Sequence, residues 1–336
     1  ASITDGDKFE MWDIPWRISD INKAINQAIE EVSKDCLQVK QTTSTFTMPA
    51  VYEYNCLSSF KGLHTVEYVY SVEEEVEISD CDSAWTAGTH VTVTADATFQ
   101  QEGSACNKLV VASAGADEEL AYTTFSAIDL SDCDEVEISI YSTIALVAGY
   151  VELRLDDTAG GGSALESLDI PATTANTWTR HKITLANPLS DTAIVRASIH
   201  QVTNQADCTI YIDYIKAVKS TSRVYKELNP QYWSIVRGST NYLKLTTTGL
   251  SVTGTNKLLR LTGYQLPALL SDDTTDSEID PSWIINYVTG QLLLGHAKSS
   301  RLDIDDKAGK AKYYLGKAEA LKTSLRSEVF PDSRWF

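Results

Sequence analysis

Apolar residues near the start of the chain recur every three or four positions, which predicts one amphipathic helix. Ser19 precedes this pattern and is suited to cap the helix N-terminus. The opposite face is polar, so we expect the helix to pack against a core through its apolar stripe. That stripe contains Ile21, Ala24, Ile25, Ala28, Ile29 and Val32.

The period then changes to the alternation typical of strands. Residues 41–72 are rich in Thr, Tyr and Val, and Pro49 interrupts them, which predicts short strands joined by a turn. Residues 73–219 continue as alternating runs separated by Gly, Asn and Asp turns. Because no helical periodicity occurs among these runs, they predict a β-sandwich. We expect strands at 90–95, 108–114, 135–143, 150–157, 177–186, 193–202 and 208–218.

The last part of the chain predicts about three short strands around Gly238, Gly249 and Gly254, followed by two helices. Asp280 and Pro281 have the residue types of an N-cap and a first helical position. The second helix is expected from about Asp305, with one small apolar face. Its other face is expected to be solvated and carries Lys307, Lys310, Lys312, Lys317 and Lys322.

Charge divides the chain in the same place as the hydrophobic pattern. Residues 73–219 carry 24 acidic and 7 basic side chains, which is nearly all of the net charge of −18. A step this sharp indicates a separate unit. We therefore predict an α+β fold in which residues 1–72 and 220–336 form one discontinuous domain. Residues 73–219 are expected to be an all-β jelly-roll sandwich inserted into a connection between strands.

The sequence lacks the common catalytic motifs. The five histidines are isolated and the six cysteines have no metal-ligand spacing, so we expect no catalytic zinc site. We expect the cysteines to be buried thiols. No GxSxG or P-loop motif occurs. No run reaches the roughly 18 apolar residues of a membrane helix, and no secretion signal is visible. We predict that the protein is not an enzyme, although a hydrolase with two facing carboxylates stays a third alternative.

The C-terminal segment is rich in residues that anchor protein interfaces. Pro331 prevents the last helix from continuing, and three aromatic rings and one arginine lie around it. We expect this segment to dock on a partner, with folding back on its own subunit as the alternative. The predicted docking residues are Phe330, Arg334, Trp335 and Phe336.

The outer part of the chain resembles the head-to-tail adaptor (head completion, or connector) proteins of tailed bacteriophages. The resemblance lies in the early helix at 18–35, the Thr/Tyr-rich segment at 45–56, the strands at 231–270 and the two terminal helices. It implies a structural virion protein in the neck, made in the host bacterial cytoplasm. Such a protein forms a homo-oligomeric ring, typically of twelve subunits. The ring docks on the portal protein, contacts tail or stopper proteins, and lines a channel through which DNA passes without sequence-specific binding. No membrane partner is implied.

The middle of the chain resembles the jelly-roll carbohydrate-binding modules of glycosidases. The resemblance lies in residues 83–111, 125–142, 177–185 and 209–218. It implies a structural Ca²⁺ near Glu102 and Asp213, with local pairing of these acids as the alternative. The alternative function is glycan binding by a surface or tail protein, with Trp85, Tyr141 and Tyr150 as stacking residues. Trp178 lies inside an alternating strand and is expected in the core.

Overall fold

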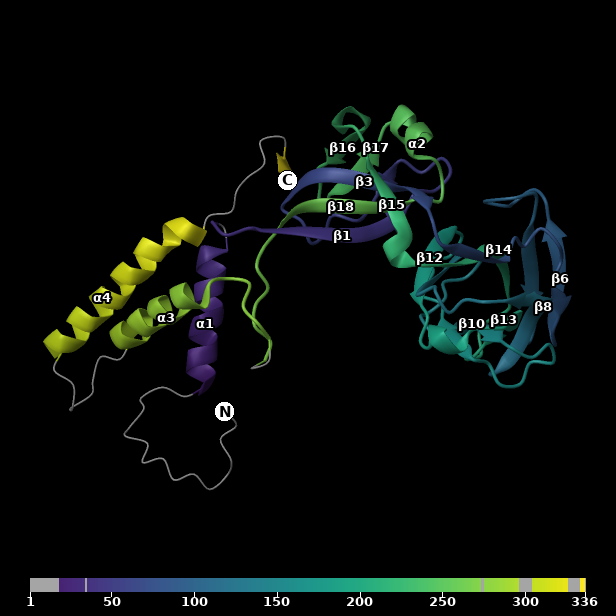
Figure 1. Ribbon diagram of the computed structural model, residues 1–336, viewed down its shortest axis with the longest axis horizontal. Coiled ribbons are helices and arrows are strands. Elements are labelled where there is room, and N and C mark those ends of the chain that lie inside the picture. The colour runs from purple at the N-terminus through teal and green to yellow at the C-terminus, as the bar shows by residue number, and fades with distance from the viewer. Residues whose placement is uncertain (1–17, 34, 273–274, 296–303, 326–332, 336) are drawn as a thin grey trace, which may run out of the picture.

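The computed structural model describes residues 18–33, 35–272, 275–295, 304–325 and 333–335. These residues form an elongated molecule with three parts along its length, as Figure 1 shows. Helices lie at one end, an antiparallel sheet lies in the middle, and a β-sandwich lies at the other end. None of the helices in these ranges is long and apolar enough to cross a membrane.

The helical end consists of α1 (Ile18–Val32), α3 (Pro281–Gly295) and α4 (Ile304–Lys322), with a short 3-10 turn at Thr323–Leu325. The apolar stripe of α1 packs with that of α3, and Ala318 of α4 joins the same cluster. Gly290 lets α4 approach α3 closely, because a Cβ there would lie 2.6 Å from Cγ of Leu315. Asp280 accepts a hydrogen bond from the amide of Ser282 at 2.8 Å, as expected at a helix start.

The middle sheet combines strands from both ends of the chain. Its order is β1 (Gln38–Phe46), β18 (Leu258–Gln265), β3 (Gly62–Val72) and β15 (Arg223–Glu227). The two-residue strand β19 (Arg334–Trp335) pairs with β3 on the edge that β15 also uses. A smaller sheet has the order β16 (Trp233–Val236), β17 (Tyr242–Leu245) and β2 (Glu53–Tyr54), beside helix α2 (Thr247–Thr253).

The sandwich is built from two antiparallel sheets that enclose one apolar core. One sheet has the order β11 (Glu166–Asp169), β10 (Val151–Asp156), β13 (Ile194–Gln201), β8 (Glu118–Ile128) and β5 (Thr86–Ala87). The other has the order β12 (Thr179–Thr184), β9 (Glu135–Ser142), β14 (Cys208–Val218), β7 (Cys106–Val111) and β6 (Val91–Asp96), with β4 (Glu75–Ser79) also on β14. Successive strands often cross between the sheets, as in a jelly roll.

The sandwich leaves and rejoins the middle sheet at neighbouring points. Val72 at the end of β3 pairs with Arg223 at the start of β15, so the two ends of the sandwich segment lie side by side. Arg223 then reaches back to the sandwich, where its guanidinium contacts Glu135 at 2.7 Å and Glu137 at 2.9 Å. Lys182 of the sandwich also donates to the hydroxyl of Thr43 in β1.

The predicted sandwich and the predicted helices at both ends are present, but several details were wrong. Strand β8 was not predicted, and residues 247–253 form helix α2 where the sequence suggested a strand. Lys307, expected on a solvated face, is only 9% exposed. None of the six cysteines forms a disulfide, and all of them except the half-buried Cys56 are buried.

Candidate functional site

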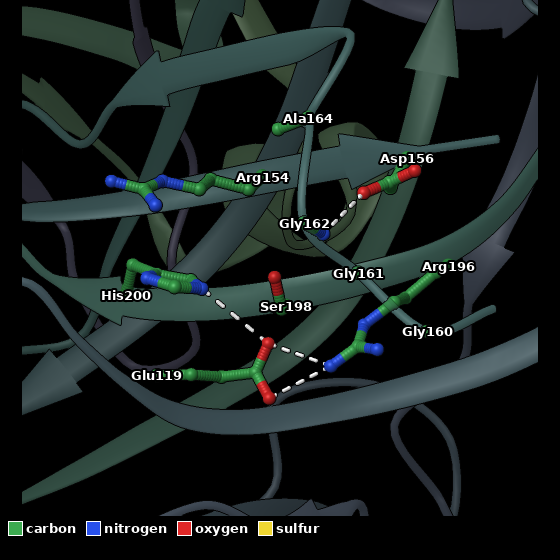
Figure 2. Close-up of a pocket in the computed structure, with 10 residues that line it drawn as sticks. All are labelled: Glu119, Arg154, Asp156, Gly160, Gly161, Gly162, Ala164, Arg196, Ser198 and His200. Carbon is green, nitrogen blue, oxygen red and sulfur yellow. Dashed lines mark hydrogen bonds and ion pairs between the residues drawn. The ribbon is translucent and has the colours of Figure 1, made fainter. Parts of the chain in front are cut away.

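A polar cavity of about 300 Å³ lies on the outer face of the sheet that contains β10, β13 and β8 (Figure 2). Strand alternation explains why charged residues gather there. In β13, Ala197 and Ile199 point into the core and are fully buried, so their neighbours in the strand face outward. The loop that follows β10 closes one side of the cavity. The lining residues are Glu119, Arg154, Asp156, Gly160, Gly161, Gly162, Ala164, Arg196, Ser198 and His200.

Arg196 is the most constrained side chain of the cavity. Its Nη2 donates to both oxygens of Glu119 at 2.7 Å, and its Nη1 donates to the carbonyl of Ala159 at 2.7 Å. The guanidinium also stacks on the ring of Tyr122, 3.9 Å from its centroid. Gly161 crosses directly over it with φ +61°, and a Cβ there would lie 2.7 Å from Cζ of Arg196. The loop therefore requires glycine at this position.

Asp156 holds the same loop from the other side. One carboxylate oxygen accepts from the amide and hydroxyl of Thr158, at 2.8 and 2.7 Å, and the other accepts from the amide of Gly162 at 3.2 Å. Burial alone raises the pKa of Asp156, but these hydrogen bonds outweigh burial and the pKa is lowered. The carboxylate is therefore charged at neutral pH, and it fixes the loop.

His200 and Arg154 form the remaining wall of the cavity. Nε2 of His200 lies 3.4 Å from Glu119, and Nη2 of Arg154 lies 3.3 Å from Asp117. Burial lowers the pKa of His200, with a further lowering from Arg154, against the opposing effect of Glu119. The ring is therefore neutral at pH 7 and has one nitrogen, Nδ1, with no partner among the described residues. The cavity thus offers fixed donors and acceptors to a polar ligand.

The predicted stacking residues do not gather at this cavity. Trp85 lies in the sandwich core at 5% exposure, so its ring has no free face for a sugar, and that prediction is corrected. Tyr150 is half-buried just before β10. Tyr141 instead joins a group of half-buried rings on the other sheet, with centroids 4.7 to 6.3 Å apart. The group contains Phe99, Tyr141, Trp178 and Tyr211. Trp178, expected in the core, therefore lies on the outer face.

The predicted calcium residues lie together, but only one of them is suited to bind a cation. Asp213 is fully buried; its Oδ2 accepts from the amides of Gln101 and Glu102 at 2.6 and 3.0 Å. Burial raises its pKa to about 6. Its Oδ1 and the Oε1 of Gln101 are buried without a hydrogen-bond partner in the described part of the chain, which fits a hard cation. The Glu102 carboxylate instead pairs with Arg180 at 3.1 Å. Among the described residues, no group of three or more His, Cys, Asp and Glu is placed to hold a metal.

The described part of the C-terminal segment lies against its own subunit. Trp335 stacks on Tyr264 with ring centroids 4.8 Å apart and is 37% exposed. The guanidinium of Arg334 lies 4.2 Å from the ring centroid of Trp233 and donates to the carbonyls of Trp233 and Pro230. This is the alternative in which the segment folds back. Phe330 and Phe336 lie outside the described residues, and docking on a partner stays a prediction.

Comparisons with known proteins give no family for this chain. No protein-family model matches the sequence, and no curated protein matches it. Among solved structures, it is similar to the family 11 carbohydrate-binding module of Clostridium thermocellum in complex with a β-1,3-1,4-mixed-linked tetrasaccharide. The identity is 11%, the match covers 46% of this chain and 97% of that one, and the TM-score is 0.31.

A second similar structure is the family 30 carbohydrate-binding module of a cellulosomal cellulase from Clostridium thermocellum. The identity is 15%, the match covers 44% of this chain and 98% of the module, and the TM-score is 0.29. Both structures belong to the class that the middle of the sequence resembles. Similarity at this level assigns no function, which therefore has to be argued from the residues.

Proposed function

We propose that this chain is a structural adaptor subunit of a phage neck, which forms a ring between the portal and the tail. The observation that carries this proposal is the way in which the two ends of the chain build one body. Strand β1 pairs with β18, and α1 packs on α3, across more than 200 positions of sequence. The sandwich is attached to this body at one place, where β3 and β15 pair. This arrangement supports a scaffold whose helices and inserted sandwich are surfaces for neighbouring proteins.

Measuring the mass of the assembled protein tests this proposal. Native mass spectrometry and negative-stain microscopy of the full chain are expected to reveal a ring, typically of twelve copies. The ring is expected to bind the portal protein of the same virus. If the chain stays monomeric at high concentration and does not bind the portal protein, the proposed adaptor function is wrong.

The C-terminal segment gives the proposed function a more local test. Deletion of residues 330–336 is expected to leave the chain folded but unable to join the portal. Val252→Ala, which changes an exposed apolar residue on α2, is the matched control and is expected to bind normally. Normal portal binding by the deletion variant would assign the segment to the stability of its own subunit alone.

The second candidate function is sugar binding, and the cavity on the sandwich favours it. Its arginines, carboxylates and loop amides are held in fixed positions, as recognition of a polyhydroxylated ligand requires. The full chain would be titrated calorimetrically with soluble β-glucan oligosaccharides and acidic oligosaccharides. Arg154→Met is expected to abolish binding, whereas Lys108→Met, on the opposite sheet, is the control. Retention of binding in the Arg154 variant would remove the cavity as the sugar site.

A further inference from the structure

Two acidic side chains are buried together in the sandwich, away from both sites discussed above. Glu166 begins β11 and is 1% exposed, and Asp191 follows the short 3-10 helix Pro188–Ser190 and is 0% exposed. The two carboxylates interact with each other. The pair therefore joins β11 to the connection between β12 and β13.

The hydrogen bonds of this pair are unequal. The two oxygens of Glu166 accept from the amides of Ala186 and Asn187, at 2.9 and 2.6 Å. The backbone of Asp191 is satisfied, because its amide donates to Pro188 and its carbonyl accepts from Leu130. Its carboxylate accepts no hydrogen bond from an amide or hydroxyl within the described ranges; burial and the side-chain hydrogen bond with the Glu166 carboxyl raise the pKa of Asp191 to about 6.

No basic side chain neutralises these carboxylates in the described part of the chain. Elsewhere in the sandwich, the buried carboxylate of Glu137 pairs with Arg180 and Arg223, whereas those of Asp156 and Asp213 accept hydrogen bonds from nearby amides. No ion pair of Glu166 or Asp191 with Lys, Arg or His occurs among the described residues. An uncompensated buried carboxylate is costly, and two in contact are costlier. A positive charge from outside the chain would remove that cost.

We propose that Glu166 and Asp191 bind a calcium ion, which fastens β11 to the turn at residues 186–191. Calcium prefers carboxylate oxygens and tolerates irregular coordination by six to eight oxygen atoms. The pair offers up to four carboxylate oxygens, and those of Asp191 accept no hydrogen bond from an amide or hydroxyl of the described residues. Backbone carbonyls and water complete the coordination sphere of such ions. This site differs from the one around Asp213, which lies on β14 against the turn at residues 101–102.

The test uses the full chain stripped of metal with a chelator. Calcium chloride is expected to raise the Tm in proportion to the logarithm of its concentration, because the ion binds the folded state. Asp191→Asn and Glu166→Gln are each expected to remove that part of the rise. Asp213→Asn is the matched control, and it is expected to retain one calcium per chain by elemental analysis and a calcium-dependent Tm.

Other outcomes overturn the proposal. If calcium leaves the Tm of the parent chain unchanged while Asp191→Asn raises it, the pair is neutralised by a shared proton. If Asp213→Asn abolishes all calcium binding, the only ion lies at that residue. Circular dichroism establishes that the variants fold. Should neither substitution at the pair fold, the calcium content of the parent chain and of Asp213→Asn decides between these results.

Discussion

Glu137 lies at the junction between the sandwich and the middle sheet, and we predict that Glu137→Gln destabilises the protein strongly. The carboxylate is 4% exposed and lies 3.1 Å from Arg180, 2.9 Å from Arg223 and 3.9 Å from Lys216. Removal of one partner from a buried ion pair costs about 3–5 kcal/mol, because the opposite charge stays buried. An unfolding entropy of about 2.1 cal/mol/K per residue gives about 0.7 kcal/mol/K for 336 residues, so the Tm should fall by roughly 4–7 °C.

The pH dependence of stability provides a second measure of the same interaction. Burial alone would raise the pKa of Glu137, but Arg180, Lys216 and Arg223 outweigh it and lower the pKa. A carboxyl group with a lowered pKa stabilises the fold above its unfolded pKa of 4.5, and this contribution disappears as the pH falls through the folded value. The Glu137→Gln variant should therefore lose less stability than the parent chain as the pH falls below 4.5.

Urea unfolding followed by circular dichroism is the suitable assay, because urea leaves ionic strength unchanged. Glu73→Gln, which changes an exposed acid near the same junction, is the control and should alter the free energy of unfolding by less than about 0.5 kcal/mol. A loss below about 1 kcal/mol for Glu137→Gln would refute the reasoning, since exposed pairs reach only that value.

Three further predictions concern other parts of the chain. Gly62→Ala places a Cβ 2.7 Å from the ring of Trp335, so we expect it to displace β19 and to lower the free energy of unfolding by about 1–3 kcal/mol. Carboxypeptidase should then digest the C-terminus faster. In a Trp335→Ala background, Gly62→Ala should not increase the rate of digestion further. Trp85→Ala empties a core position and should cost about 3–5 kcal/mol in urea unfolding, and a change near zero would mean that the ring lies outside the core. Burial lowers the pKa of His181 from 6.5 to about 4, so the free energy of unfolding should fall by roughly 3 kcal/mol as the pH drops through this range. His181→Phe should flatten that titration, and an unchanged slope would exclude His181 as its source.

The helices were predictable because their signals are local. The start of α3 needs only an acid followed by proline at residues 280–281, and both the cap and the helix are present. The apolar face of α1 was predictable in the same way from its spacing, and its residues Ala28, Ile29 and Val32 are all buried. The buried position of Lys307 was not predictable, because the lysine-rich face follows from helical spacing alone, whereas burial depends on what packs beside α4.

The cavity on the sandwich was missed because its residues share no sequence pattern. Glu119, Arg154 and Arg196 are far apart in the chain and meet only through the order of β8, β13 and β10. The run of glycines at residues 160–162 is a local signal for the loop alone, and it does not indicate which strands lie beside that loop. Strand β8 was missed for a related reason: its residues from Tyr122 to Ile128 are largely polar or half-exposed and show no apolar alternation.

The junction explains how the acidic sandwich is attached to the nearly neutral remainder of the chain without independent motion of the two. Entry and exit are adjacent at Val72 and Arg223, so the insertion leaves the pairing of β3 with β15 intact. Two strands leaving one point would permit rotation on their own. Arg223 opposes rotation because it belongs to β15 while its guanidinium is 2% exposed between two sandwich carboxylates. Rotation would expose the buried Arg223 and leave the buried Glu137 without this partner, at the cost of about 3–5 kcal/mol given above. The sandwich is therefore held in one orientation relative to the middle sheet.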